Sequence, residues 1–292
     1  LGKFEPRVYF GENVPDYSII GGVKTDTPVE FDYPDDTSAN GQRNYTYTGT
    51  GGVPVGSLLN KAVFALKYQE QRILLSNLIN KDSKILFERN PRDRVAKVAP
   101  WLTLDGDPYP ALVDGKIIWI IDGYTTSAGY PYARQTVLSN ATADALTTNS
   151  ASIASQRNQS VNYIRNSVKA TVDAYNGTVT LYQWDEKDPV LKTWSKAFPN
   201  TVKPKSEISA QLLEHIRYPE DLFRVQRDIL SSYHVKTAEA FYGGQDFWRV
   251  PRDPSTFGAN ASAQPPYYLT LQMPGTKKPV FSLTTPFVPR GG

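Results

Sequence analysis

The sequence contains no cysteine, one methionine and two histidines among its 292 residues. Without cysteine the chain cannot form disulfides, thiolate zinc sites or thiol nucleophiles, and it suits an oxidising exterior where stray thiols are a liability. His215 and His234 have neither the HxxxH nor the HExxH spacing of a zinc site. We therefore predict no cofactor and no assigned metal site, while carboxylates near turns leave a calcium site open.

Long apolar runs and an excess of one charge sign are also missing. The 32 basic and 29 acidic residues are interspersed and give a net charge of +3, so we expect no nucleic acid partner. The longest purely apolar run, residues 117–121, is far shorter than the roughly 20 residues that a membrane-spanning helix needs. The chain starts at Leu1 without a signal region, which predicts a section of a longer protein.

Turn-forming residues are plentiful, with 22 prolines and 20 glycines, so we expect extensive loops. Asp114-Gly115 lies between the apolar segments 111–113 and 116–121, and Asn176-Gly177 lies between segments 161–175 and 178–184. Both pairs are typical of the type I′ turn, in which the two central residues have positive φ. The sequence therefore predicts two β-hairpins that share one buried sheet.

Helix signals separate and follow these hairpins. Pro91, Pro189 and Pro219 are placed to open helices, and Ser57 precedes an apolar repeat with the i, i+3, i+4, i+7 spacing of a core-facing helix, at Leu58, Leu59, Ala62, Val63, Ala65 and Leu66. Strand patterns return at the end of the chain. We predict an α+β fold with a hairpin-built mixed or antiparallel sheet, a helical lobe and long loops.

The same signals divide the chain into three segments. Residues 1–133 are predicted to hold an N-terminal α+β region with a helix pair and the first hairpin. Residues 134–160 are rich in Ala, Ser, Thr, Asn and Gln, which favours a polar mobile loop with a marginal helix. Residues 161–292 are predicted to hold the second hairpin, the helical lobe and the C-terminal strands, and to be intertwined with 1–133 as one alternative.

Asp122 and Asp173 are the strongest catalytic candidates, because each sits at a predicted strand end beside a tyrosine. Two carboxylates across a cleft are what glycoside hydrolysis requires. The alternative interpretation is that each aspartate caps backbone donors where its strand leaves the sheet. The chain has no G-x-S-x-G elbow and no phosphate-binding glycine loop, so a serine hydrolase and a nucleotide-binding protein are disfavoured.

Tyrosines beside turns and prolines are the candidates for binding, since an aromatic ring can offer both an apolar face and a hydroxyl. They are Tyr124, Tyr130, Tyr132, Tyr175, Tyr267 and Tyr268. Such tyrosines also serve as core and turn residues.

Six segments taken together resemble uncharacterised protein family 0182, whose members are large multi-pass membrane proteins of actinobacteria and cyanobacteria. The segments read YFGE at 9–12, EFDYP at 30–34, IWIIDGYTTS at 118–127, NYIRNSVKA at 162–170, RYPEDL at 217–222 and PPYYL at 265–269. The resemblance implies that the partner of this section is a transmembrane region of the same protein that is absent from this chain. It also implies a plasma-membrane location with this section extracytoplasmic, and it implies no catalytic or binding residue.

Three functions follow as hypotheses. The first is a non-catalytic module that binds an envelope component, whether lipid, glycan or protein. The second is an envelope hydrolase acting on glycans through Asp122 and Asp173. The third is an accessory domain of a transporter formed by the absent transmembrane helices.

Overall fold

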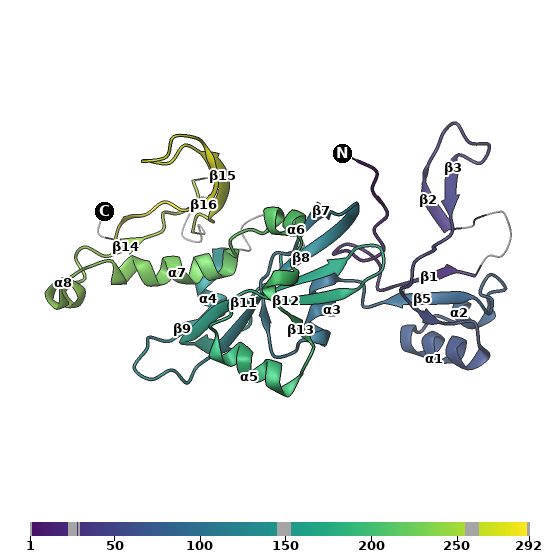
Figure 1. Ribbon diagram of the computed structural model, residues 1–292, viewed down its shortest axis with the longest axis horizontal. Coiled ribbons are helices and arrows are strands. Elements are labelled where there is room, and N and C mark those ends of the chain that lie inside the picture. Colours follow the sequence, from purple (N-terminus) through teal and green to yellow (C-terminus); the bar gives the residue numbers. More distant parts are fainter. Residues whose placement is uncertain (1, 23–27, 29, 145–152, 255–262, 291–292) are drawn as a thin grey trace. The chain divides into compact units, whose positions relative to one another are not determined.

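The computed structural model describes residues 2–22, 28, 30–144, 153–254 and 263–290 (Figure 1). Helices and small, mostly antiparallel sheets alternate along the chain, so the predicted α+β class is confirmed. The chain forms two compact units. Unit 1 consists of Leu1–Val98, Pro110–Trp119 and Thr171–Val179, and unit 2 consists of Ala99–Tyr109, Ile120–Ala170 and Thr180–Gly292. The segment boundaries at residues 133 and 160 stay a prediction.

Unit 1 is built from short strands and three helices. Its elements are β1 (Tyr17–Gly21), β2 (Glu30–Pro34), β3 (Gln42–Tyr45), β4 (Val53–Pro54), α1 (Leu58–Tyr68), α2 (Arg72–Leu75), β5 (Ser83–Phe87), α3 (Pro91–Val98) and most of β7 (Tyr109–Val113). β5 pairs antiparallel with β1 on one side and β4 on the other, and β2 pairs antiparallel with β3.

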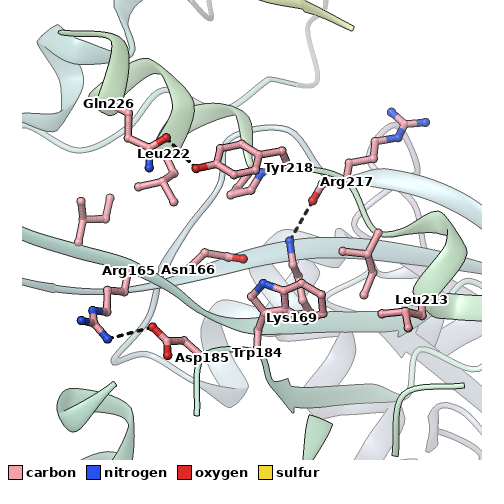
Figure 2. A pocket seen from close by; sticks show the side chains of 13 residues that line it. Arg165, Asn166, Lys169, Trp184, Asp185, Leu213, Arg217, Tyr218, Leu222 and Gln226 are labelled. Carbon is pink, nitrogen blue, oxygen red and sulfur yellow. Dashed lines mark hydrogen bonds and ion pairs between the residues drawn. The ribbon is translucent and has the colours of Figure 1, made fainter. Parts of the chain in front are cut away.

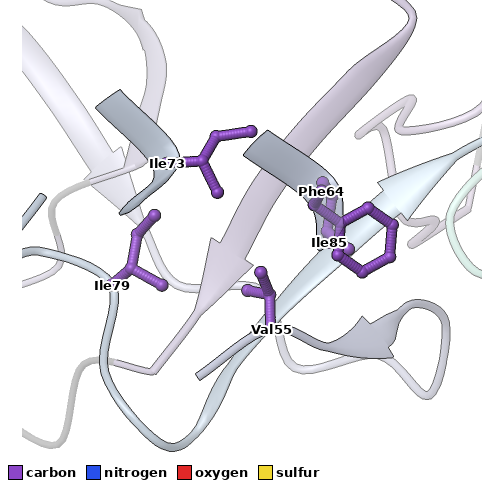
Figure 3. Close-up of a cluster of buried hydrophobic side chains, with 5 residues drawn as sticks. All are labelled: Val55, Phe64, Ile73, Ile79 and Ile85. Atoms are coloured by element: carbon purple, nitrogen blue, oxygen red, sulfur yellow. The ribbon is translucent and has the colours of Figure 1, made fainter. Parts of the chain in front are cut away.

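An apolar cluster joins this small sheet to its helices. Ile85 of β5 and Val55 are fully buried, and they pack with Phe64 of α1 and with Ile73 and Ile79 (Figure 3). A second cluster contains Phe10, Ile20, Tyr47 and Leu86. Burial of such side chains stabilises each by roughly 1.5–3 kcal/mol relative to exposure, so these clusters are the main source of stability in unit 1.

The orientation predicted for α1 is wrong. The helix is present and Ser57 caps it, with the Ser57 side chain accepting a hydrogen bond from the Asn60 N–H. However, Leu58, Leu59, Val63 and Leu66 are exposed, and Phe64 is the buried residue of this helix. Of the predicted repeat only Ala65 packs, partly buried, against the core cluster, where Phe64 fills the contact with the sheet.

Unit 2 is organised around a larger sheet. Its strand order is β13-β12-β11-β8-β6, and β7 also pairs with β8. The strands are β6 (Thr103–Leu104), β8 (Lys116–Ser127), β11 (Tyr163–Asp173), β12 (Val179–Gln183) and β13 (Val202–Lys203). The first residues of β8 and β12 and the last residues of β11 are assigned to unit 1. Because β8 and β11 are buried over most of their length, they read as long apolar or mixed runs rather than as a clean alternation.

The other elements of unit 2 are mostly helices and two-stranded sheets. They are β9 (Thr136–Val137), α4 (Leu138–Ala141), β10 (Ser160–Val161), α5 (Pro189–Ala197), the 3-10 helix η2 (Lys205–Glu207), α6 (Ala210–His215), α7 (Glu220–Tyr233), α8 (Ala238–Gly243), β14 (Trp248–Arg249), β15 (Tyr267–Leu271), β16 (Val280–Thr284) and β17 (Val288–Pro289). The C-terminal strands β15 and β16 pair antiparallel. The predicted loop at 134–160 contains β9, α4 and β10, while residues 145–152 lie outside the described residues.

The two predicted hairpins differ in their turns. Asp114 and Gly115 have φ of 50° and 74°, so the first turn has positive φ at both positions, as predicted. At the second turn only Gly177 has positive φ, and the Asp173 side chain accepts hydrogen bonds from the Tyr175 and Asn176 N–H groups. The hairpin is present, since β11 and β12 are neighbours, but the aspartate cap replaces the type I′ turn.

Candidate functional site

A pocket of about 580 Å³ lies within unit 2 (Figure 2). One wall comes from β11, through Asn166 and Lys169, and from the residues that follow β12, Trp184 and Asp185. The opposite wall is formed by apolar and polar side chains from the end of α6 to the middle of α7, including Leu213, Ile216, Tyr218, Leu222 and Gln226. The size falls within the range of small-molecule sites.

Local sequence places the helical wall. Ser209 caps α6 by accepting from the Leu212 N–H, and α6 ends at His215, four residues before Pro219. Pro219 then precedes α7, where a proline suits the start of a helix because its missing N–H is not needed there. The segment between the two helices therefore carries Tyr218 to the rim, where its hydroxyl donates to Gln226 Oε1 at 2.7 Å.

A buried ion pair lies behind the pocket. Lys169 of β11 bonds Asp122 of β8 through its ammonium group, and both side chains are almost fully buried. The Lys169 ammonium also donates to the Arg217 carbonyl at 3.1 Å, and the Asn166 amide donates to Asp122 Oδ1 at 2.9 Å. These contacts hold the floor of the pocket in one arrangement, because an unpaired charge at this depth would cost several kcal/mol.

Burial raises the pKa of Asp122 to about 6, and the neighbouring Asp105 adds to the increase, while Lys169 and Asn166 favour the charged form. The carboxyl therefore changes protonation closer to neutral pH than an exposed aspartate does.

Asn166 lines this pocket and carries a buried hydrogen-bond acceptor at its floor. Its side chain is 9% exposed and lines the cavity, and its Oδ1 has no hydrogen-bond partner within the part of the chain that the structure describes. The amide cannot be turned around, since that would place its oxygen against the Asp122 carboxylate. A buried acceptor without a partner costs about 1–3 kcal/mol, so this oxygen lowers the stability of the pocket floor.

Two of the three cationic side chains that line the pocket, Arg165 and Lys169, are paired with carboxylates, and the third, Arg217, lies over aromatic rings. The Arg165 guanidinium bonds Asp185 Oδ2 at 3.0 Å, and Lys169 bonds Asp122. The Arg217 side chain points away from the cavity in Figure 2, and its guanidinium lies 4.5 Å from the Tyr109 ring centroid. Trp184 is half-buried at the pocket, with the Lys205 ammonium 4.0 Å from its ring centroid. The cavity thus combines an aromatic face, aliphatic side chains and neutral hydrogen-bonding groups.

A second buried polar network surrounds Asp105 and Asp221 in unit 2. Asp105 accepts a hydrogen bond from the Tyr124 hydroxyl, and its Oδ2 accepts from the Asp221 N–H at 3.0 Å. Asp221 accepts from Gln156 at 2.6 Å and from Arg224 at 3.2 Å. Burial raises the pKa of Asp221, and Asp105 raises it further, against the opposing charge of Arg224. This network ties the start of α7 to the sheet.

The two predicted catalytic aspartates belong to different units. Asp122 lies in unit 2 and is bonded to side chains, as described above. Asp173 lies in unit 1, where it caps the Tyr175 and Asn176 N–H groups and bonds the Lys116 ammonium at 3.2 Å. These contacts have the geometry of the alternative interpretation, in which the aspartate caps backbone donors where its strand ends. Their use as a catalytic pair stays a prediction.

The predicted binding tyrosines are dispersed. Tyr124 is buried on Asp105, and Tyr175 in unit 1 stacks on Tyr47 with ring centroids 4.9 Å apart. Tyr132 is fully exposed, and Tyr130 lines a second pocket of about 520 Å³ in unit 2 that shares Ile164 and Arg165 with the first.

Tyr267 and Tyr268 lie on β15. Tyr267 is partly exposed. The Tyr268 hydroxyl donates to the Tyr218 carbonyl, and its ring stacks on Phe281. Tyr268 therefore supports the Tyr218 segment at the rim. The binding role of all six tyrosines stays a prediction.

Sequence reasoning did not find Asn166, Lys169 and Trp184. One signal could have found Asn166 and Lys169, because both are polar residues inside the largely buried strand β11, whereas no signal singled out Trp184. Polar side chains inside a buried strand need partners and so indicate a network. The partner Asp122 lies 47 positions from Lys169, and no spacing rule connects the two.

Together, the α+β fold and the pocket beside Trp184 define a domain with a candidate small-molecule site. A family model described as an uncharacterised protein family, UPF0182, matches residues 1–291, and this chain belongs to that family. The chain is 53% identical to a UPF0182 protein of Kocuria rhizophila over 98% of its length, 54% identical to one of Streptomyces coelicolor over 100%, and 56% identical to one of Frankia casuarinae over 99%. It spans 29%, 28% and 27% of these relatives.

No solved structure matches the chain. Among the helices of the described residues, none combines the length and the apolar character needed to cross a membrane.

Proposed function

We propose that this chain is a non-catalytic binding module in the extracytoplasmic part of a larger membrane protein, and that its unit 2 pocket binds a neutral, hydroxyl-rich envelope component of the glycan class. The observation that carries the proposal is the pocket wall, in which the Trp184 ring lines the cavity together with the neutral amide side chains of Asn166 and Gln226. A sugar hydroxyl would bond the exposed Gln226 amide.

The surrounding groups support a neutral ligand. Arg165 and Lys169 each have a carboxylate partner, so an anionic group would have to compete with Asp185 or Asp122. Trp184 offers an apolar ring face, on which the C–H face of a sugar ring packs, and Gln226 offers an amide at the rim. An arrangement of one aromatic platform and a few fixed polar groups is typical of small-ligand sites.

The binding experiment compares two tryptophans of unit 2. Neutral oligosaccharides, for example hexamers of N-acetylglucosamine, glucose and mannose, are titrated into the 292-residue chain and followed by saturation-transfer NMR and tryptophan fluorescence. We expect saturable binding by at least one of them. Trp184→Ala should weaken it about tenfold, and Asn166→Ala should weaken it similarly. Trp194→Ala is the matched control, because Trp194 stacks on Trp101 instead of lining the pocket.

Two outcomes would contradict the proposal: absence of saturable binding by all the neutral sugars, or equal losses from Trp184→Ala and Trp194→Ala. Release of reducing ends from a bound oligosaccharide that depends on Asp122 and Asp173 would favour the hydrolase instead, and co-purification of a solute with the full-length protein would favour the transporter accessory.

A separate experiment tests the extracytoplasmic location of this section. The chain contains no cysteine, so an Asn40→Cys substitution at an exposed position introduces a thiol into this section of the full-length protein. Extracytoplasmic placement predicts that a membrane-impermeant maleimide labels this thiol in intact cells. Labelling only after the cells are lysed would place the section inside.

A further inference from the structure

An apolar surface covers the outer side of α1 and α2 in unit 1. Leu66 is 81% exposed and Leu78 is 76% exposed. We call this surface the outer face, and its residues are Leu58, Leu59, Val63, Leu66, Leu75 and Leu78. Scattered exposed leucines are ordinary on a protein surface, but six large aliphatic side chains within 21 consecutive residues are not.

The core of unit 1 does not need these side chains. Phe64, Ile73 and Ile79, from the same segment, point inward and pack on Val55 and Ile85 (Figure 3). The segment is therefore apolar on two sides, and one of them is already covered. A helix that is apolar all round is normally buried all round, so the outer face indicates a second apolar environment.

The charge of this segment indicates which apolar environment the outer face contacts. Residues 57–82 contain four basic residues, Lys61, Lys67, Arg72 and Lys81, and two acidic ones, Glu70 and Asp82. The difference, four minus two, is a net charge of +2 in this segment against +3 for the whole chain. The Arg72 side chain is 92% exposed, and Lys67 and Lys81 are also exposed. Arg72 has a partly exposed carboxylate neighbour, Glu70, at 3.9 Å. Leucines bordered by exposed cations are typical of helices that lie in the interface of an anionic bilayer.

We propose that the outer face of α1 and α2 inserts into the surface of a membrane with anionic headgroups. The leucines would enter the boundary between headgroups and acyl chains, while Lys67, Arg72 and Lys81 would contact lipid phosphates. A second copy of the chain fits less well, because a two-fold contact through this face would bring like charges together. This surface is independent of the unit 2 pocket.

The experiment measures partition of the 292-residue chain onto large unilamellar vesicles by sedimentation. One set contains phosphatidylcholine alone, and the other contains phosphatidylcholine with 30 mol% phosphatidylglycerol. We expect binding to the anionic vesicles that weakens in 0.5 M NaCl. Leu66→Ser with Leu78→Ser should reduce the partition coefficient at least tenfold. Arg72→Gln with Lys81→Gln should reduce it by about fivefold per charge, on anionic vesicles only.

The matched control is Leu230→Ser with Leu271→Ser, which removes two exposed leucines from unit 2. Circular dichroism confirms that each variant is folded before the comparison. The proposal is overturned if the chain does not bind anionic vesicles, or if the unit 1 and unit 2 leucine variants lose binding equally. It is also overturned if light scattering shows a lipid-free dimer that Leu66→Ser with Leu78→Ser dissociates, because the occupant would then be a second copy.

Discussion

Buried arginines have different hydrogen-bond partners in unit 1 and in unit 2. In unit 1 the buried Arg89 bonds backbone carbonyls, those of Tyr9 at 2.7 Å and Pro15 at 3.1 Å. In unit 2 the buried Arg224 instead bonds carboxylates, with Asp221 at 3.2 Å and Glu220 at 2.9 Å. A backbone carbonyl satisfies a cation whatever the neighbouring side chains are, whereas a carboxylate partner makes the fold depend on both residues and on pH.

Buried ion pairs contribute little net stability, because removing two charges from water costs as much as their attraction returns. They do impose one geometry on the groups around them. The Asp122–Lys169 pair lies directly behind the pocket and shares Asp122 Oδ1 with Asn166. We interpret the buried charges of unit 2 as the means by which the pocket floor is kept in place, at some cost in stability.

The strongest test of this difference between the units compares two lysine substitutions, one in each unit. Lys169→Met leaves Asp122 buried and uncompensated, so we expect a loss of about 3–5 kcal/mol in the free energy of unfolding at pH 8. Lys116→Met removes the partner of Asp173, but Lys116 is 54% exposed, so its loss should stay below about 1 kcal/mol. Urea unfolding followed by circular dichroism and tryptophan fluorescence measures both.

A double variant controls for lost packing at Lys169. Asp122→Leu combined with Lys169→Met replaces the pair with apolar side chains and should recover most of the stability. If Lys169→Met and Lys116→Met destabilise the protein equally, the proposed difference between the two units does not hold.

Stability against pH provides the second comparison. Asp122 has a pKa raised from 3.8 to about 6 in the folded chain. Below about pH 3 the carboxyl is protonated in both states. As pH rises toward and through 6, the unfolded chain ionises first, so the free energy of unfolding decreases, by at most about 3 kcal/mol from this group.

Asp122→Asn should remove this decrease between pH 4.5 and pH 7.5, because the amide cannot ionise. Asp173→Asn is the matched variant in unit 1 and should keep the wild-type slope, since it leaves Asp122 in place. The measurement is urea unfolding at four pH values, with the slope of the wild type compared with that of each variant. An Asp122→Asn slope equal to that of the wild type would show that Asp122 does not titrate in this range.

Local signals predicted much of the fold. Asp114-Gly115 has both positive φ angles of its turn, and Pro189 opens α5 as predicted. These features depend on residues adjacent in sequence, so the local sequence is sufficient to predict them. The orientation of α1 was not predictable in this way, because periodicity identifies an apolar side but not what covers it.

The candidate site was predicted only in part. Asp122 was identified as a residue at a predicted strand end, and this placement is wrong, because β8 continues to Ser127 and Asp122 lies in its middle. Its partners Asn166 and Lys169 come from a neighbouring strand. Register between strands that are distant in sequence depends on the packing of the whole sheet, which a single sequence does not specify. The pocket is therefore a tertiary feature, whereas the turns and caps are local ones.

Helix caps give the smallest of the three comparisons. Asp188 caps α5 and is fully buried; it accepts from the Val190 and Leu191 N–H groups and from the hydroxyls of Thr125, Ser167 and Tyr163. Although burial opposes ionisation, these hydrogen bonds lower the pKa of Asp188, so its contribution to stability is lost as pH falls through that lowered pKa. Asp188→Ala leaves several buried donors unsatisfied, and we expect a loss of about 2 kcal/mol or more at pH 7.

Ser57→Ala in unit 1 is the matched cap variant. The Ser57 side chain accepts one hydrogen bond, from the Asn60 N–H at 3.2 Å at an exposed helix start, so water can replace it. We expect a loss of about 0.5–1 kcal/mol. Thermal and urea unfolding at pH 7 compare the two caps. Asp188→Asn keeps one acceptor oxygen, so its loss of stability should lie between that of Asp188→Ala and that of Ser57→Ala. Equal losses at the two caps would mean that the buried hydroxyl network around Asp188 adds nothing to the cap, and that unit 2 does not depend on its buried carboxylates as we infer.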